Sequence, residues 1–182
     1  MIPPADDPAG KPTDIGLAVV PRSQWEMLDD WRDIFGLRGS GSNSIRIENQ
    51  VVPEHFLVRA NFLNVDLSKP TPGYQLHGNP LYAGRVQSAL HTEIAATAIG
   101  AAFAMLDEYA ETISTRETYT PPIIPRVQHH HYQRIYGMAL GKISSAQAIV
   151  LETARQHGVL SARGMSGGAP FTPQEEMILI AR

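Results

Sequence analysis

Residues 89–106 read ALHTEIAATAIGAAFAML, and this alanine-rich stretch decides the fold class. Small alanines alternate with larger apolar residues such as Ile99 and Phe103, so the stretch is apolar nearly all the way round. No proline interrupts residues 81–114, which therefore predict one long helix. Because a helix without a polar face is normally buried inside a bundle, we expect other helices to cover it.

A second long helix is predicted after the proline-rich break TPPIIP at residues 120–125. We expect it over residues 126–156, ending at Gly158, because glycine is favoured just past a helix C-terminus. Residues 161–170 are rich in glycine and serine and predict a loop.

A third helix has a clear start signal. Thr172 is a good N-cap, Pro173 fits the first helical position, and Glu175 completes a capping box. The chain stops at Arg182 in mid-pattern without a C-cap, so we expect the sequence to be a piece cut at its ends.

The part before residue 61 is β-rich in its pattern. Ile45 and Ile47 alternate with Arg46 and Glu48, which predicts a half-buried strand. We expect strands at residues 15–20, 44–50 and 55–60, and a strand or an irregular connection at 25–35.

The sequence therefore predicts an α+β fold in which a partial β-barrel or sheet segment precedes an antiparallel helical bundle. The β part covers residues 1–60 and the helical part residues 81–182. The prolines and glycines of residues 61–80 indicate a linker between them.

Composition excludes several classes of function. The 182 residues carry 15 Lys+Arg against 18 Asp+Glu, a net charge of −3, so no basic field favours nucleic acid. The absence of cysteine excludes disulfides and thiolate chemistry. No signal peptide is present in residues 1–13, and no apolar run looks long enough to span a bilayer. We expect a cytoplasmic protein without a membrane partner.

Three motifs suggest chemistry that their context does not support. The glycine-rich residues 36–42 precede an alternating strand instead of a helix, so they are not a dinucleotide fingerprint. The adjacent histidines 129–131 cannot close on one ion from a helix, so we expect no metal site. Residues 165–168 (MSGG) follow no strand and are a weak nucleophile motif.

An ordered set of motifs resembles the acyl-CoA dehydrogenase superfamily. The set is DDW at residues 29–31, GLRGSGSN at 36–43 and VVPEH at 51–55, followed by the alanine-rich helix. It is similar to the end of the family's middle β-domain and the start of its C-terminal helical domain. This resemblance covers nearly the whole chain but only part of the family's enzyme.

Within that superfamily the chain looks most like the flavin-dependent two-component monooxygenases of the p-hydroxyphenylacetate hydroxylase type. The residues that carry this are HGNPLY at 77–82, GAA at 100–102 and Tyr132-x-x-x-Tyr136. The resemblance implies reduced FMN or FAD as cofactor, a separate flavin reductase, a homotetramer and a small aromatic substrate.

Site residues follow from the same resemblance. The family's R-x-x-F corner and following glutamine match Arg116, Tyr119 and Gln128, with Tyr119 in place of phenylalanine. In the family this arginine reaches a flavin phosphate of a neighbouring subunit, and Thr120 could add a hydroxyl donor. Possible substrate-pocket residues are Tyr74, His77 and Tyr82, for which loop packing is an equally good interpretation; no catalytic residue is assigned.

Two other functions stay open at this point. One is an acyl-CoA dehydrogenase proper with bound FAD, although no glutamate here matches that family's catalytic base. The other is a truncated, non-catalytic module for helical packing or oligomerisation. Whether the isolated chain is an enzyme is left undecided by the sequence, since little of the flavin enclosure is present.

Overall fold

The computed structural model describes residues 16–58 and 66–182. The chain divides into two compact units, residues 1–64 and residues 65–182, called here the β unit and the helical unit. Each unit is described by itself.

The β unit contains two antiparallel pairs of very short strands. Strand β1 (Leu17–Ala18) pairs with β4 (Leu57–Val58), and β2 (Glu26–Met27) pairs with β3 (Ile45–Arg46). The 3₁₀ helices η1 (Arg22–Gln24), η2 (Arg38–Ser40) and η3 (Glu54–Phe56) lie between them. Within the described residues the expected strands are thus present but two residues long, and residues 15, 59 and 60 of the expected strands lie outside the described part. The stretch 25–35 is largely an irregular connection.

The β unit has no core of its own among the residues described. None of residues 16–58 is buried, and Ile45 and Ile47 are 57% and 43% exposed. The predicted half-buried strand is therefore wrong for this chain, because a two-stranded pair needs another layer over its apolar face.

Hydrogen bonds hold the glycine-rich loop between β2 and β3. The Trp31 indole donates to the Leu37 carbonyl at 3.0 Å, and the Trp31 amide donates to Asn43 Oδ1 at 3.1 Å. The Ser44 amide donates to Asp30 Oδ1 at 2.9 Å. Leu37 itself has a left-handed backbone with φ 47°. The aspartate and tryptophan of the DDW motif thus shape this loop.

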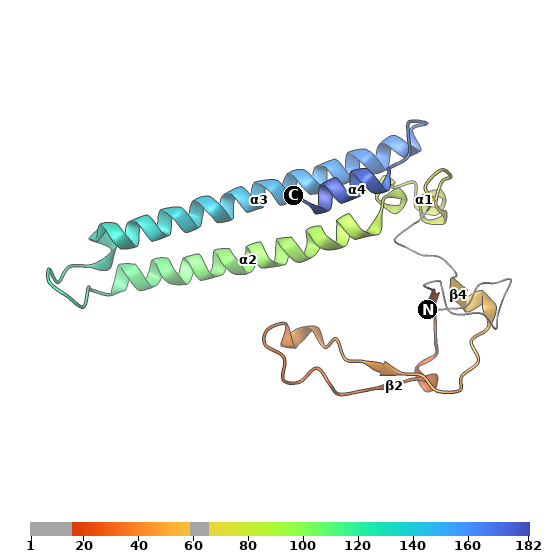
Figure 1. Ribbon diagram of the computed structural model, residues 1–182, viewed down its shortest axis with the longest axis horizontal. Coiled ribbons are helices and arrows are strands. Elements are labelled where there is room, and N and C mark those ends of the chain that lie inside the picture. The colour runs from red at the N-terminus through yellow and green to blue at the C-terminus, as the bar shows by residue number, and fades with distance from the viewer. Residues whose placement is uncertain (1–15, 59–65) are drawn as a thin grey trace. The chain divides into compact units, whose positions relative to one another are not determined.

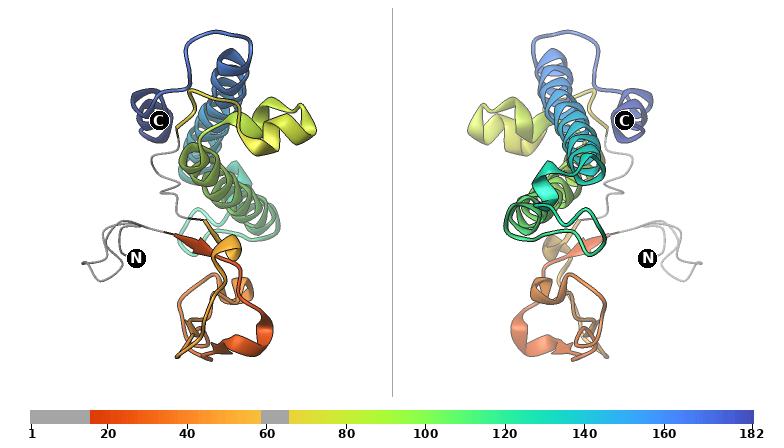
Figure 2. Two further views of the ribbon diagram at one scale, coloured as in Figure 1. Left: turned by 90° about the vertical axis from the view of Figure 1, so that its right-hand side faces the viewer. Right: turned by 90° about the vertical axis from the view of Figure 1, so that its left-hand side faces the viewer.

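The helical unit is built on two long helices, α2 (Val86–Thr115) and α3 (His130–Met165), which run side by side and antiparallel (Figures 1 and 2). Helix α4 (Pro173–Ile180) folds back against both (Figure 1). The short helices α1 (Pro72–His77) and η5 (Pro80–Ala83) precede α2, and η6 (Arg126–Gln128) precedes α3. Helix α1 lies inside the stretch predicted as a linker.

The end of α3 differs from the prediction. The helix passes through Gly158 and continues to Met165, so residues 161–165 are helical and not a loop. The turn comes at Gly167, whose φ is +78°, with the Gly168 amide donating to the Arg163 carbonyl at 3.1 Å. The left-handed turn requires glycine at 167, whereas the apolar Val159 and Leu160 favour continuation after Gly158.

The start of α4 confirms its sequence signal. The Glu175 amide donates to Thr172 Oγ1 at 3.2 Å, and the Thr172 amide donates to Glu175 Oε2 at 3.0 Å. With Pro173 at the first helical position, this is the predicted capping box.

Helix α2 is far more exposed than its composition predicts. Its buried residues are Ser88, Leu106 and Ile113, while Ile94 and Met105 are 62% and 73% exposed. Helices α3 and α4 pack against α2, and within the described part of the chain no third long helix covers its remaining faces. The expected burial inside a bundle is therefore not reached by this chain.

The expectation that no apolar run could span a bilayer is also wrong by length and composition. An 18-residue window within the 30 residues of α2 has a mean hydropathy of 1.4, and 6% of it is buried. Alanine accounts for much of this value. The same composition suits a helix packed among other helices, where small side chains allow close approach.

Two glycine substitutions test where α3 ends. Gly167→Ala should destabilise the protein by about 1 kcal/mol, because a side chain disfavours positive φ. Gly158→Ala should stabilise it by up to about 1 kcal/mol, because alanine is the better helix former. Neither added β-carbon would meet an atom within 4 Å, so the backbone alone sets both signs. Urea unfolding midpoints measure both changes in stability. If the two substitutions changed the stability in the same direction, this helix boundary would be contradicted.

Candidate functional site

The connection between α2 and α3, residues 116–129, is called the corner. Its two arms pair antiparallel, with Glu117 opposite Pro125. The Arg126 amide donates to the Arg116 carbonyl at 2.9 Å, and the Thr118 amide donates to the Ile124 carbonyl at 3.0 Å. These bonds give the proline-rich break a defined shape.

The four residues predicted to bind flavin all lie on the corner and are exposed. Arg116 caps the end of α2, and Gln128 ends η6. Tyr119 is 84% exposed, and Thr120 follows it. The corner thus presents a guanidinium, a hydroxyl and an amide to solvent. Their binding role remains a prediction.

Sequence reasoning missed Arg126, which is only 8% exposed. Its Nε donates to the Glu117 carbonyl at 2.9 Å. Its guanidinium carbon lies 4.8 Å from the ring centroid of Tyr119 and 5.5 Å from that of Tyr132. The signal in the sequence was an arginine two residues before Gln128, with Tyr119 upstream of it and Tyr132 downstream.

Tyr109 of α2 connects the corner to the hairpin. Its hydroxyl donates to the Tyr132 carbonyl at 3.4 Å. Burial raises the pKa of Tyr109, with a smaller opposing effect from Arg126. The hydroxyl therefore stays protonated at neutral pH, as a donor.

The residues predicted for a substrate pocket lie at the other end of the hairpin. The rings of His77 in α1 and Tyr82 in η5 stack with centroids 4.6 Å apart. The Tyr74 carbonyl accepts from the Gly78 amide at 2.7 Å, closing α1. These contacts are packing between two short helices, and they leave Tyr82 53% exposed.

The two predicted sets cannot share one pocket in a single copy of the chain. Helix α2 separates them, and its 30 residues span about 45 Å at about 1.5 Å per residue. A ligand that meets both sets must therefore contact two copies.

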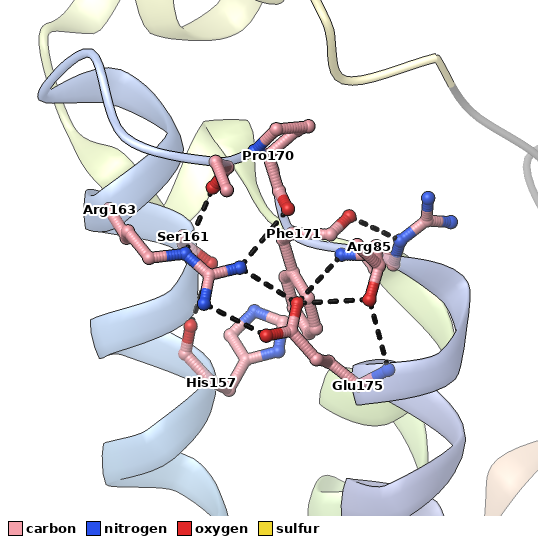
Figure 3. Close-up of polar contacts among 9 residues, drawn as sticks. Arg85, His157, Ser161, Arg163, Pro170, Phe171 and Glu175 are labelled. Atoms are coloured by element: carbon pink, nitrogen blue, oxygen red, sulfur yellow. Dashed lines mark hydrogen bonds and ion pairs between the residues drawn. The ribbon is translucent and has the colours of Figure 1, made fainter.

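A buried polar cluster fastens α4 and η5 to the hairpin. It consists of Arg85, Ser88, His157, Ser161 and Glu176, and is called the polar latch (Figure 3 labels Arg85, His157 and Ser161 of it). Ser88 Oγ lies 2.9 Å from His157 Nδ1, and the Ser88 amide donates to Glu176 Oε1 at 3.1 Å. The Arg85 Nε donates to the Phe171 carbonyl at 2.8 Å. The latch thus joins three segments distant in sequence.

The latch contains a serine, a histidine and a carboxylate, but its geometry does not suit nucleophilic catalysis. Ser88 is 1% exposed, so no substrate reaches its hydroxyl. Glu176 contacts Ser88 instead of orienting His157. A β-carbon at Gly84 would lie 2.7 Å from His157 Nε2, so the backbone of η5 closes the other side of the ring. The cluster is structural.

An ion pair next to the latch holds the loop before α4 (Figure 3). The Arg163 guanidinium donates to both oxygens of Glu175 at 2.8 Å, and its Nε donates to the Ala169 carbonyl at 2.9 Å. The bonds from Arg163, then those from Thr172, lower the pKa of Glu175 to about 2. Glu175 thus caps α4 and anchors it to α3.

Two apolar grooves follow the hairpin. One, of about 350 Å³, lies where α4 meets α2 and α3, between residues such as Ile99, Ile149 and Leu179. The other, of about 300 Å³, lies nearer the corner, between Met105, Tyr109 and Ile135. Neither is lined by a residue predicted to bind flavin or substrate.

No protein-family model matches the chain. Over 102 residues it is 29% identical to the oxygenase subunit HsaA, a flavin-dependent monooxygenase of Mycobacterium tuberculosis, covering 56% of this chain and 25% of HsaA. The Rhodococcus jostii HsaA is 28% identical over 102 residues, covering 56% and 26%.

A pigment production hydroxylase of a Rhodococcus species is 29% identical over 99 residues, covering 54% of this chain and 24% of the hydroxylase. Over about a hundred residues this chain is thus similar in sequence to flavin-dependent monooxygenases. The matches span about a quarter of the length of these relatives. The resemblance read from the sequence is thereby confirmed in its monooxygenase branch.

A solved structure shows the fold. The chain superposes on XiaF from a Streptomyces species, determined in complex with FADH2 and glycerol, with a TM-score of 0.76 and 21% identity. The match covers 97% of this chain and 41% of XiaF. The predicted α+β fold with an antiparallel helical part is confirmed.

The latch predicts how stability depends on pH. Burial lowers the pKa of His157 below its ordinary 6.5, partly opposed by Glu176. The unfolded chain therefore binds more protons than the folded one just below pH 6.5, so the free energy of unfolding should fall as the pH drops from 7 to 5. Urea unfolding at several pH values measures this slope. His157→Gln should flatten it, and an unchanged slope would contradict the assignment.

Proposed function

We propose that this chain acts in the oxygenase component of a two-component flavin-dependent monooxygenase, which hydroxylates a small aromatic substrate using reduced flavin and O₂. The observation that carries the proposal is the similarity to three oxygenase or hydroxylase proteins over about a hundred residues. Their names favour hydroxylation over the oxidation of an acyl-CoA.

The corner has the chemistry that a flavin phosphate needs. Arg116, Thr120 and Gln128 are exposed donors within one short connection, and Glu117 is its one carboxylate. A guanidinium donates two parallel hydrogen bonds to a phosphate, and a hydroxyl and an amide can take further oxygens. These residues therefore fit the phosphate end of FMN or FAD.

The bound reduced flavin would supply the activation of O₂. The residues of this chain would bind its phosphate at the corner, and Tyr119 would offer an exposed aromatic face beside it. Dry surroundings are needed for such chemistry, because water leads to loss of the activated oxygen. The apolar hairpin can supply them once another surface covers it.

We propose that a second copy of this chain provides that cover, within a homotetramer. Exposed apolar side chains run along both long helices, with Ile94 and Met105 on α2 and Leu151 on α3. A contact between copies would also bring the corner of one near the substrate-side residues Tyr74, His77 and Tyr82 of another, which α2 separates within one copy.

A separate reductase would deliver the reduced flavin, as the term oxygenase subunit in the names of relatives suggests. Reaction in the cytoplasm, where reduced nicotinamide cofactors are available to such a reductase, fits this proposal. A non-catalytic packing module is the second candidate, favoured by the exposed apolar face of α2.

Flavin titration tests the binding role of the corner. We expect the purified chain to bind FMN or FAD more weakly than micromolar, because the corner holds only the phosphate end. Arg116→Ala should weaken binding about tenfold through loss of charge-assisted hydrogen bonds. Flavin fluorescence and NMR line broadening measure this, with Arg155→Ala as control because Arg155 pairs with Glu152 on exposed α3. Micromolar binding that ignores Arg116→Ala would place the flavin elsewhere.

Sedimentation tests the proposed assembly. Ile94→Glu and Met105→Glu place charge on the exposed apolar face of α2, and each should weaken self-association at least tenfold, since burying such a side chain contributes about 1.5–3 kcal/mol. Lys142→Glu is the control, because this exposed residue of α3 is already charged. A monomeric wild-type chain at micromolar concentration, or equal loss in the control, would refute assembly through this face.

A further inference from the structure

Arg126 is a buried cation with no anion beside it. Its side chain is 8% exposed, and its single side-chain hydrogen bond to the residues described goes from Nε to the Glu117 carbonyl. No carboxylate within residues 16–58 and 66–182 forms an ion pair with it. The terminal nitrogens are not fully enclosed, since Gln24 Oε1 is the one enclosed side-chain atom without a partner among the described residues, so a ligand can reach them. A charge on so largely buried a side chain is normally paired, because removing it from water is costly.

A second arginine faces Arg126 across the corner. Arg116 lies directly opposite it in the antiparallel pairing, with the Arg126 amide bonded to the Arg116 carbonyl at 2.9 Å. Like charges directly opposite each other in such a pair are destabilising. An anion bound by both guanidinium groups would remove this repulsion and supply the missing partner of Arg126.

Arg126 is also preorganised for binding. Tyr119 and Tyr132 lie against its guanidinium, with ring centroids 4.8 and 5.5 Å away, and the bond from Nε to Glu117 fixes its direction. The terminal nitrogens make no hydrogen bond to the residues described. A held guanidinium loses little conformational entropy on binding, and its planar fork matches two phosphate oxygens.

We propose that Arg126 and Arg116 together form a phosphate-binding site at the corner, in which Arg126 is the preformed arm. The ligand group is a phosphate or pyrophosphate. That the phosphate belongs to a flavin rests on the function proposed above, whereas the site itself rests on the two arginines. Tyr119 then serves mainly to hold Arg126 in place.

The experiment uses inorganic pyrophosphate and the intact chain. Two-dimensional ¹H–¹⁵N spectra follow the arginine Nε–H signals, with that of Arg126 assigned by its loss in Arg126→Lys. Pyrophosphate should shift the Arg126 signal saturably. Arg126→Gln should weaken binding about tenfold or more, since charge-assisted hydrogen bonds are lost. Arg126→Lys should be intermediate, because it keeps charge without the fork.

Arg134→Gln is the matched control, because Arg134 is an exposed arginine of α3 near the corner. Its affinity for pyrophosphate should stay within about twofold of wild type, as expected for a surface charge outside the site. Circular dichroism checks that each variant keeps its helices; if Arg126→Gln fails to fold, Arg126→Lys and Arg116→Gln carry the comparison. Absence of a saturable shift in wild type, unchanged binding in both Arg126 variants, or equal loss in Arg134→Gln would overturn the proposal.

A competition arm separates this site from the proposed function. FMN should displace pyrophosphate in wild type. Pyrophosphate binding that depends on Arg126 without displacement by FMN or FAD would support the phosphate site and refute its assignment to flavin. Flavin binding that is indifferent to Arg126 and to pyrophosphate would overturn the site while leaving flavin binding intact.

Discussion

The antiparallel contact between α2 and α3 positions every other part of the helical unit. Helix α4 and η5 dock where the hairpin begins, and the corner closes it where α2 ends. Two helices can bury only the stripe along which they touch. The remaining apolar faces of α2 stay exposed, and it is these faces that the proposed contact with a second copy would cover.

The two ends of this hairpin are fastened by different means. At the latch, Ser88 bonds both His157 and Glu176, so these buried polar groups are satisfied, and burial lowers the pKa of His157 so that its ring is neutral at pH 7. At the corner, Arg126 is buried among tyrosines and keeps its charged end without a carboxylate. A satisfied network stabilises the fold, whereas a largely buried guanidinium that has no carboxylate beside it and whose terminal nitrogens are not enclosed is suited to bind an anion. This contrast is why the corner, and not the latch, is the candidate binding site.

Local features such as helix caps were predicted well from the sequence, whereas burial and tertiary contacts were predicted poorly. The capping box at Thr172 depends on four consecutive residues and was found. Gly158 and Gly167 are equally plausible helix ends in the sequence. Only the structure shows that the chain turns at Gly167, which has a positive φ, and that Gly158 stays within the helix. The sequence overestimated the burial of Ile45 and of α2. A pattern of apolar residues indicates a face suited to burial, but it does not show whether another element of this chain packs against that face. Arg126 was missed because its burial and its contact with the Tyr132 ring, six residues further along the chain, exist only in the folded corner.

The distance along α2 links the proposed cofactor site and the proposed assembly. Residues at the corner and residues around η5 lie about 45 Å apart in one copy, at about 1.5 Å per helical residue. A flavin whose phosphate is bound at the corner of one copy can therefore contact only the η5 residues of another copy. The interface proposed over the apolar face of α2 would then also complete the proposed flavin site, because an antiparallel neighbour along the hairpin would bring η5 of one copy to the corner of the other. Under the two proposals the exposed apolar surface of α2 would contribute to the flavin site, and loss of assembly would remove the η5 residues of the other copy from the flavin while leaving phosphate binding at the corner intact.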